Sequence, residues 1–264
     1  MTAKTIGIIN QKGGVGKSTT TQNLGYSLTT IENKKVLLID FDPQSSLTII
    51  SGFPEPDEIE NTIAKLMKNS IEDIDIENKN DYIVKCNGFD LLPCNIELSA
   101  IEVSLVNILS REQILKNIVS LYKADYDYIL IDCSPSLGML TINALVASDS
   151  VIIPVTPDYV SAKGLQLLLT NVLRVKRKIN PQIEIEGILL TRYDERTNQA
   201  SEISTMIDEA YGSQIRIFDN LIPNSVKASE AGKKGMSVIQ YKPNNPVALA
   251  YSALANELVG IHNK

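Results

Sequence analysis

Residues 7–25, GIINQKGGVGKSTTTQNLG, join an apolar run to a hydroxyl-rich segment through a loop that holds three glycines and two lysines. Proteins that hold nucleotide phosphates place a strand, a glycine loop, a lysine, a serine and a helix in this order. Glycines let backbone N–H groups approach the phosphate oxygens, and the N-terminus of the following helix adds the positive end of a dipole. The stretch therefore predicts a phosphate-binding loop, and a plain tight turn is the alternative.

The polar residues of this loop each have an expected role. Lys17 would reach the terminal phosphates, and the hydroxyl of Ser18 can ligate Mg²⁺. The expected nucleotide contacts in the loop and the first turn of the helix are Gly13, Gly14, Val15, Gly16, Lys17, Ser18 and Thr19.

The rest of the chain alternates short apolar runs with helical patterns. Several runs are apolar throughout, which is typical of strands that helices bury on both faces of a parallel sheet. The pattern predicts an α/β fold with a doubly wound, mostly parallel sheet and helices on both faces, whose ligands bind beyond the carboxyl ends of the strands. We expect strands at residues 5–10, 35–40, 89–93, 126–132, 150–155 and 185–191, and helices at residues 17–31, 59–69, 110–123, 136–147, 161–179, 198–211 and 245–260.

Three aspartates end two of these apolar runs, where a parallel sheet would bring them beside the loop. Asp40 and Asp42 end VLLIDFD, and Asp132 ends YDYILID. Asp132 fits a carboxylate that holds Mg²⁺ directly or through water. Asp40 is a candidate either for the Mg²⁺ shell or for the fold of the following loop. Aspartates at strand ends also cap turns, and this stays the alternative for Asp40 and Asp42.

Composition excludes several kinds of site. The single histidine, His262, excludes histidine-dependent triads and multi-histidine zinc sites. Three cysteines are too few and too unevenly spaced for a disulfide framework. No apolar segment approaches the roughly 18–20 residues that span a bilayer, and no signal-peptide pattern opens the chain. We therefore expect a cytoplasmic protein.

Charge is unevenly distributed along the chain. The formal net charge of −6 argues against non-specific nucleic-acid binding if it is read over the whole chain. Residues 41–103 hold 4 Lys and 13 Asp+Glu, a net charge of −9, whereas residues 159–242 hold 12 Lys+Arg and 9 Asp+Glu, a net charge of +3. An acidic chain can thus still carry a basic face.

The loop departs from the usual G-x-x-x-x-G-K-[ST] pattern, because Gln11 stands at the first glycine position and Lys12 is added. KGGVGKST resembles the deviant Walker A box of the ParA/MinD family of ATPases. The resemblance to the ParA/Soj branch covers nearly the whole chain, through the stretches NQKGGVGKSTTTQNLG, LLIDFDPQ, ILIDCSPSLGMLTINAL, VIIPVTPDYVSAKGL, ILLTRYDERTN and NSVKASEAGKKG.

This resemblance implies a reaction cycle. ATP-bound monomers would form a sandwich dimer that binds double-stranded DNA without sequence preference, and a centromere-bound, ParB-like partner protein would then stimulate ATP hydrolysis. A plasmid or chromosome would be the cargo, the cofactors would be ATP and Mg²⁺, and the protein would associate with the nucleoid.

The resemblance also assigns roles to residues. Lys17 would serve its own nucleotide, Lys12 would reach the partner's phosphates across the dimer, and Asp42 would position the attacking water. Residues 134–138 would form the second switch. Residues near Thr191 to Tyr193 and Pro223 to Ser225, among them Pro223 and Asn224, fall where family members surround the adenine.

Two basic residues, Arg196 and Lys227, match positions that resemble DNA contacts in Soj-like proteins. Lysine at position 227, where the family frequently has arginine, keeps the charge but loses the planar fork. Solvated surface charge is the alternative for each. Further DNA candidates are Lys233, Lys234, Lys242 and Arg192, and a basic helix face is open between solvation and DNA contact at Arg174, Lys176, Arg177 and Lys178.

Three rival functions share the loop. A MinD-like, membrane-associated positioning ATPase would need a cationic amphipathic C-terminus, but residues 245–264 hold one Lys and one Glu. An iron–sulfur reductase would need ligand cysteines in matching loops. A small-molecule kinase or amide-forming ligase would act without DNA-stimulated turnover. The loop begins near residue 12, so we expect residues 1–264 to form one ATPase domain with no N-terminal DNA-binding domain.

Overall fold

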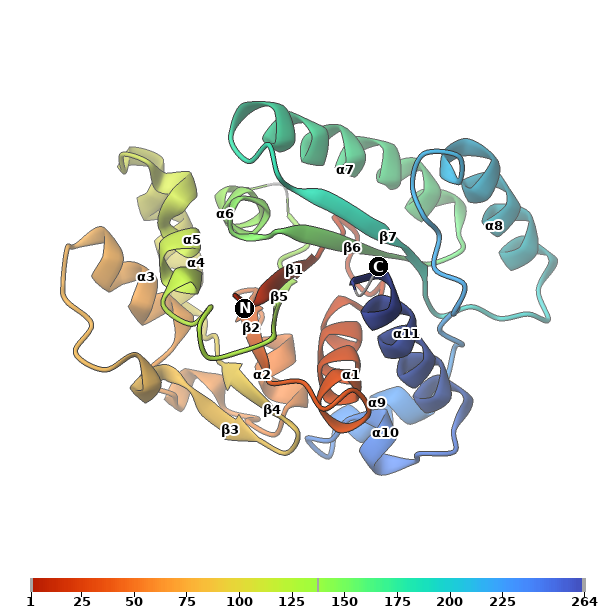
Figure 1. The fold of residues 1–264 in the computed structure, drawn as a ribbon, viewed down its shortest axis with the longest axis horizontal. Helices are drawn as coiled ribbons and strands as arrows, with labels where there is room; N and C mark the ends of the chain where they lie inside the picture. The colour runs from red at the N-terminus through yellow and green to blue at the C-terminus, as the bar shows by residue number, and fades with distance from the viewer. Residues whose placement is uncertain (1, 137, 263–264) are drawn as a thin grey trace.

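The computed structural model describes residues 2–136 and 138–262, and within them a single seven-stranded sheet forms the centre (Figure 1). The strand order is β3-β4-β2-β5-β1-β6-β7. Every neighbouring pair is parallel except β3 and β4. The strands are β1 (Lys4–Ile8), β2 (Val36–Phe41), β3 (Val84–Cys86), β4 (Phe89–Leu92), β5 (Tyr128–Cys133), β6 (Ser150–Val155) and β7 (Glu184–Leu190). The predicted α/β, mostly parallel sheet is confirmed.

The burial of the strands explains why their sequences do not alternate. All residues of β2, β5 and β6 are buried, because helices cover both faces of the sheet. β3, which we did not predict, is short and partly exposed, and it adds an antiparallel edge beside β4.

Helices pack on both faces of the sheet. The α-helices are α1 (Lys17–Thr30), α2 (Ser46–Ile50), α3 (Ile63–Ile71), α4 (Glu97–Ser104), α5 (Ile114–Ser120), α6 (Met139–Ala147), α7 (Tyr159–Lys178), α8 (Asn198–Tyr211), α9 (Val226–Gly232), α10 (Val238–Tyr241) and α11 (Pro246–His262). Short 3₁₀ turns lie at Pro56–Glu58, Lys79–Tyr82, Leu105–Asn107 and Arg111–Gln113.

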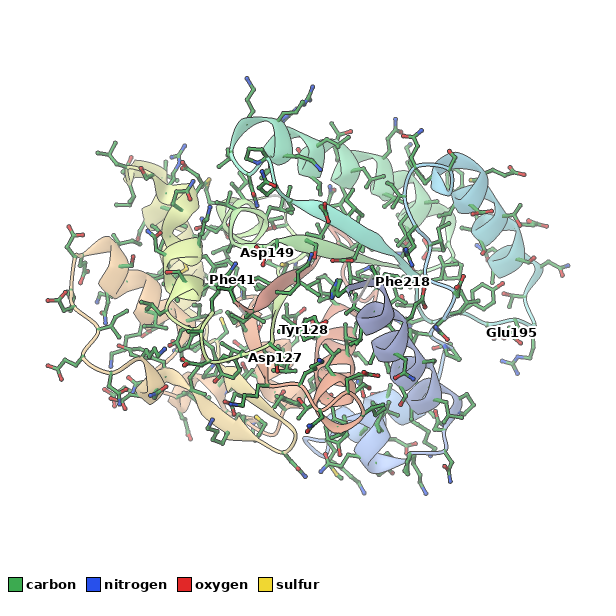
Figure 2. The ribbon with its side chains drawn as sticks, viewed as in Figure 1. Phe41, Asp127, Tyr128, Asp149, Glu195 and Phe218 are labelled. Carbon is green, nitrogen blue, oxygen red and sulfur yellow. The ribbon has the colours of Figure 1, made fainter. Side chains whose placement is uncertain are left out.

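Two apolar clusters form the core, one on each face of the sheet. The first cluster joins the sheet to α3 through α8 and includes Phe41. The second joins it to α1, α2 and α9 through α11 and includes Phe218. Figure 2 labels both phenylalanines, which come from opposite sides of the sheet. Helices from the two ends of the chain share the second cluster, because α11 packs against α1.

Several helix boundaries differ from the sequence prediction. The helix predicted at 59–69 begins at Ile63, because the side chain of Thr62 caps it by accepting from the N–H of Lys65. The helix predicted at 136–147 begins at Met139, and residue 137 lies outside the described residues. Four unpredicted helices, α2, α4, α9 and α10, have eight residues or fewer and are too short to show a helical period.

Candidate nucleotide site

The glycine loop follows β1 and ends at α1, at the carboxyl edge of the sheet. Gly14 and Gly16 have φ angles of 74° and 87°, a region that residues with a side chain rarely adopt. Gly16 is the N-cap of α1, so Lys17 and Ser18 lie in the first helical turn. The sequence prediction of a strand, a glycine loop and a helix is confirmed.

The side chain of Lys17 is buried at the base of the loop. Its Nζ donates to the carbonyl of Lys12 at 3.3 Å. Burial lowers the pKa of Lys17, and the negative charges of Asp132 and Asp42 oppose that shift. The lysine thus lies near the strand-end carboxylates of Asp132 and Asp42, and its contact with phosphates stays a prediction.

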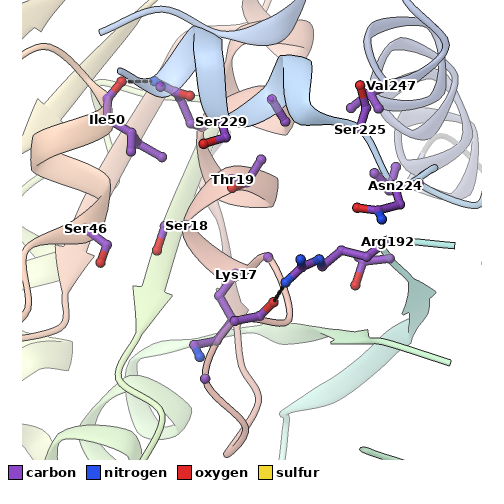
Figure 3. Close-up of a pocket in the computed structure, with 18 of the residues that line it drawn as sticks. Lys17, Ser18, Thr19, Ser46, Ile50, Arg192, Asn224, Ser225, Ser229 and Val247 are labelled. Atoms are coloured by element: carbon purple, nitrogen blue, oxygen red, sulfur yellow. Dashed lines mark hydrogen bonds between the residues drawn. The ribbon is translucent and has the colours of Figure 1, made fainter. Parts of the chain in front are cut away.

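A cavity of about 700 Å³ opens beside the loop (Figure 3), a volume within the usual range of ligand pockets. The loop, the segment after β2, the segment after β7 and the helices α9 and α11 all contribute to its walls. Of the predicted nucleotide and catalytic residues, the lining includes Gly13, Gly14, Gly16, Lys17, Ser18, Thr19, Asp42, Pro223 and Asn224. The side chain of Val15 is fully buried, so only its backbone could serve a ligand.

Asp132 carries a buried carboxylate whose oxygens have no hydrogen-bond partner among the described residues. It lies opposite Asp40 in the β2–β5 register. Burial raises the pKa of Asp132 well above its ordinary value, the charge of Asp40 adds to this shift, and Ser18 and Lys17 oppose it. A buried carboxylate without partners is costly, and a bound cation would offset the cost.

The residues around Asp132 fit Mg²⁺. This ion prefers oxygen ligands, and it keeps several waters while binding one or two carboxylates and the substrate phosphates. Ser18 and Asp132 supply a hydroxyl and a carboxylate oxygen and would hold the ion. When bound, Mg²⁺ would neutralise phosphate charge. The described residues contain no group of three or more acidic, cysteine or histidine side chains placed to hold a metal.

Asp40 uses its carboxylate to hold the segment after β2. Its Oδ2 accepts from the N–H and from the Oγ1 of Thr48, both at 2.7 Å, and its Oδ1 accepts from the N–H of Asp42 at 3.3 Å. Burial raises the pKa of Asp40 to about 7, against these hydrogen bonds. The contacts match the loop-fold alternative, and the role in the Mg²⁺ shell stays a prediction.

Asp42 lies at the wall of the cavity. Its side chain also accepts from the N–H of Gln44 at 3.1 Å, so it caps the turn that follows β2. The turn places the carboxylate in the lining of the same cavity as the glycine loop, and its catalytic role stays a prediction. The side chain that makes the capping contact is thus also the predicted catalytic group.

Lys12 faces away from this cavity. Its Nζ contacts Oδ2 of Asp158 at 2.7 Å and Oγ of Ser161 at 3.1 Å, and the residue lines a neighbouring pocket of about 310 Å³. Asp158 is the N-cap of α7 and accepts from the N–H of Ser161. The sequence analysis missed Asp158, whose only sequence signal is an aspartate three residues before the helical serine.

The predicted DNA residues lie on two adjacent segments. The N–H of Tyr193 donates to the Ile222 carbonyl at 3.0 Å, and the N–H of Asn224 donates to the Tyr193 carbonyl at 2.9 Å. Arg196 follows one of these segments and Lys227 follows the other. The fold therefore brings the surroundings of both residues together.

Each of these cations has a local partner. Arg196, 88% exposed at its side chain, makes two 2.8 Å contacts with Asp194. Lys227 pairs with Glu230 at 2.8 Å. Lys233 lines the nucleotide cavity, and the Nζ of Lys234 lies 4.9 Å from the centre of the Tyr241 ring. DNA contact stays a prediction for all four.

A model of a family described as an AAA domain matches residues 3–185. The sporulation initiation inhibitor protein Soj of Bacillus subtilis is 41% identical over 97% of this chain and 98% of its own length. The chain belongs to the ParA/MinD family of ATPases. The predicted ParA/Soj resemblance is therefore confirmed.

Two further comparisons support this assignment. The chromosome-partitioning ATPase Soj of Treponema pallidum is 38% identical, with 97% of each chain covered. A structure of cobyrinic acid a,c-diamide synthase from Mycobacterium smegmatis, with a bound ATP analogue and magnesium, has a TM-score of 0.83 and 30% identity over 97% of this chain and 94% of that one. Both relatives share this ATPase fold over nearly their full length.

Among residues 2–136 and 138–262, none of the helices is long and apolar enough to cross a membrane.

Proposed function

We propose that this ParA/Soj-type protein is a Mg²⁺-dependent ATP hydrolase, which converts ATP and water into ADP and phosphate and dimerises when it binds ATP. The position of Lys12 carries the proposal. Lys17 lines the nucleotide cavity of its own protomer, whereas Lys12, on the same loop, lines the neighbouring pocket. A cation outside the cavity of its own protomer supports a role on the phosphates of a second protomer, which Lys12 would contact after leaving Asp158.

In this cycle the ATP dimer binds double-stranded DNA without sequence preference. Arg196 and Lys227, with Lys233 and Lys234, are the proposed contacts, because cations on one surface attract phosphates and release counterions. A centromere-binding, ParB-like protein stimulates hydrolysis, and the cargo is a plasmid or chromosome. Relatives that carry the names Soj and chromosome-partitioning ATPase support this proposal. The proposal places one ATPase domain, residues 1–264, in the cytoplasm on the nucleoid.

The deciding experiment measures duplex binding with ATP, with ADP and without nucleotide, over a series of salt concentrations. We expect binding only with ATP, and a steep decrease as salt rises. The double variant Arg196→Glu with Lys227→Glu should still dimerise with ATP but lose DNA. Double-variant binding equal to that of the parent would contradict the surface assignment.

The same preparation separates the rival functions. A MinD-like, membrane-associated ATPase would bind anionic vesicles with ATP and leave duplex DNA unbound. An amide-forming ligase is the second rival, because the chain is similar to the Mycobacterium smegmatis synthase. Such a ligase would turn over ATP in response to an amine donor rather than to DNA. Stimulation by DNA alone favours the partition function.

A further inference from the structure

Two consecutive residues after β7 bind two consecutive carbonyls of the glycine loop. The Oγ1 of Thr191 donates to the carbonyl of Val15 at 2.7 Å, and the Nη1 of Arg192 donates to the carbonyl of Gly14 at 3.0 Å. The contact of Arg192 is drawn as a dashed line in Figure 3, where its side chain extends to the loop. These residues are separated by more than 170 positions in the chain.

The geometry of the peptide bond gives these contacts a consequence. In a planar trans peptide, the carbonyl of one residue and the N–H of the next point in opposite directions. A donor that holds the Gly14 carbonyl therefore also fixes the direction of the Val15 N–H, which points away from that donor. The contact of Thr191 with Val15 fixes the N–H of Gly16 in the same way. Backbone N–H groups are what a phosphate-binding loop uses to hold oxygens.

Arg192 has an unfavourable backbone conformation. Its φ angle is 52°, in the left-handed region that costs a residue with a side chain roughly 1–2 kcal/mol. The residue is exposed, yet it lines both the nucleotide cavity and the neighbouring pocket of Lys12. Guanidinium hydrogen bonds are charge-assisted, so the contact can hold a carbonyl even at the surface.

We propose that Arg192 is a positioning residue for phosphate binding, which orients the Val15 N–H by holding the Gly14 carbonyl. This inference deepens the proposed nucleotide function and rests on it. Arg192 contributes through the loop backbone and leaves the terminal phosphates to Lys17. It also ties the loop to the segment that carries Arg196, a residue we propose for DNA contact.

The test compares Arg192→Met with Arg192→Lys and with Arg216→Met. Arg216 is also an exposed arginine and lies outside both pockets, so Arg216→Met is the matched control. Affinities for ADP and for adenosine are measured by competition against a fluorescent ADP analogue, and the thermal midpoint is measured without nucleotide.

We expect Arg192→Met to weaken ADP binding by about 3- to 10-fold, which corresponds to the loss of one hydrogen bond. Arg192→Lys should recover part of this loss, because its ammonium can still donate to the carbonyl. Adenosine affinity and the nucleotide-free midpoint should not change, since adenosine carries no phosphate and the contact lies at the surface. Arg216→Met should match the parent in all measurements.

Three results would overturn the inference. Unchanged ADP affinity in Arg192→Met would show that the loop holds its conformation alone. An equal loss for adenosine would show that the guanidinium contacts the nucleoside instead. A lowered nucleotide-free midpoint with no selective loss of ADP would show a purely structural role. A parent protein that binds neither ligand would overturn the proposed function and this inference together, so the two failures are distinguishable.

Discussion

The Nζ of Lys12 lies 2.7 Å from Oδ2 of Asp158, 146 positions further along the chain. The pair is half-exposed, and Asp158 also accepts hydrogen bonds from Thr156 and Ser161. Burial alone would raise the pKa of Asp158, but the hydrogen bonds from Lys12, Thr156 and Ser161 outweigh it and lower that pKa well below its ordinary value. A lysine held in this way must leave its own protomer's carboxylate before it can contact a partner's phosphate.

Replacing Asp158 tests whether this ion pair opposes dimerisation. Asp158→Asn removes the charge that holds Lys12 and keeps an N-cap side chain for α7. We expect the ATP concentration for half-maximal dimerisation to fall by about two- to fivefold, the range for an exposed ion pair. Light scattering during an ATP titration measures this. Asp158→Ala is the comparison, because it also removes the cap. Identical titrations for Asp158→Asn and the parent would contradict the prediction.

The two lysines of the loop should fail differently when replaced. Lys17→Ala removes the cation inside the cavity, so we expect it to lose nucleotide binding in calorimetry. Lys12→Ala should retain the affinity for ATP as a monomer but fail to dimerise, because Lys12 lies outside that cavity. Equal loss of nucleotide binding in both variants would show that Lys12 serves its own nucleotide.

Asp42→Ala tests the proposed catalytic role. The variant removes the carboxylate at the cavity wall, so we expect steady-state ATP hydrolysis to fall by about 100-fold or more. Binding of ATP, dimerisation and duplex binding should persist, because no cation of the loop is removed. Phosphate release measures the loss of hydrolysis, and native mass spectrometry measures the retained dimerisation. The conservative variant Asp42→Asn keeps the turn cap, and normal hydrolysis in it would exclude a role for the negative charge.

A second charged cluster anchors the end of α11 to the sheet. The carboxylate of Glu186 accepts from Nε2 of His262 at 3.0 Å and pairs with Lys4 at 3.2 Å, and the Tyr128 hydroxyl meets Nδ1 of the same imidazole at 2.9 Å. Burial alone would raise the pKa of Glu186, but the side chains of His262, Ser150 and Lys4 together outweigh burial and lower it to about 2. The anchor lies at the amino ends of β1, β5 and β7, away from the nucleotide cavity.

This anchor predicts a pH-dependent stability. The ordinary pKa of a glutamate is 4.5, and the folded value is lower, so the unfolded chain takes up the proton first as pH falls. The contribution of Glu186 is therefore complete above about pH 4.5 and is lost as pH falls toward 2. We expect Glu186→Gln to lower the free energy of unfolding by about 1–2 kcal/mol at pH 7. The free energies of unfolding of both proteins, measured by urea titration, should converge as pH approaches 2, and a constant difference between pH 7 and pH 2 would contradict the assignment.

The glycine loop and the strand ends were predictable because their chemistry is local. The positive φ angles of Gly14 and Gly16 need glycine. Apolar runs that end in aspartate place Asp42 and Asp132 at the carboxyl edge of any parallel sheet that the chain can build. Short elements such as β3 and α10 were missed, because three or four residues carry no readable period.

The pairing of side chains from distant segments could not be predicted from the sequence. Nothing local to Asp158 or Arg192 shows that these residues meet Lys12 and the Gly14 carbonyl. Those contacts depend on the order in which β6 and β7 join the sheet and on how each following turn directs its side chains.

Sequence chemistry alone therefore predicted the strand, glycine loop and helix and the strands that end in acids, since backbone freedom and hydrophobic period are properties of neighbouring residues. The tertiary structure decided which partner holds each charge, because an ion pair or hydrogen bond forms only when strand register and crossover connections bring two remote atoms within about 3 Å. The contact of Lys12 with Asp158 and the contact of Arg192 with the Gly14 carbonyl were decided by the tertiary structure in this way.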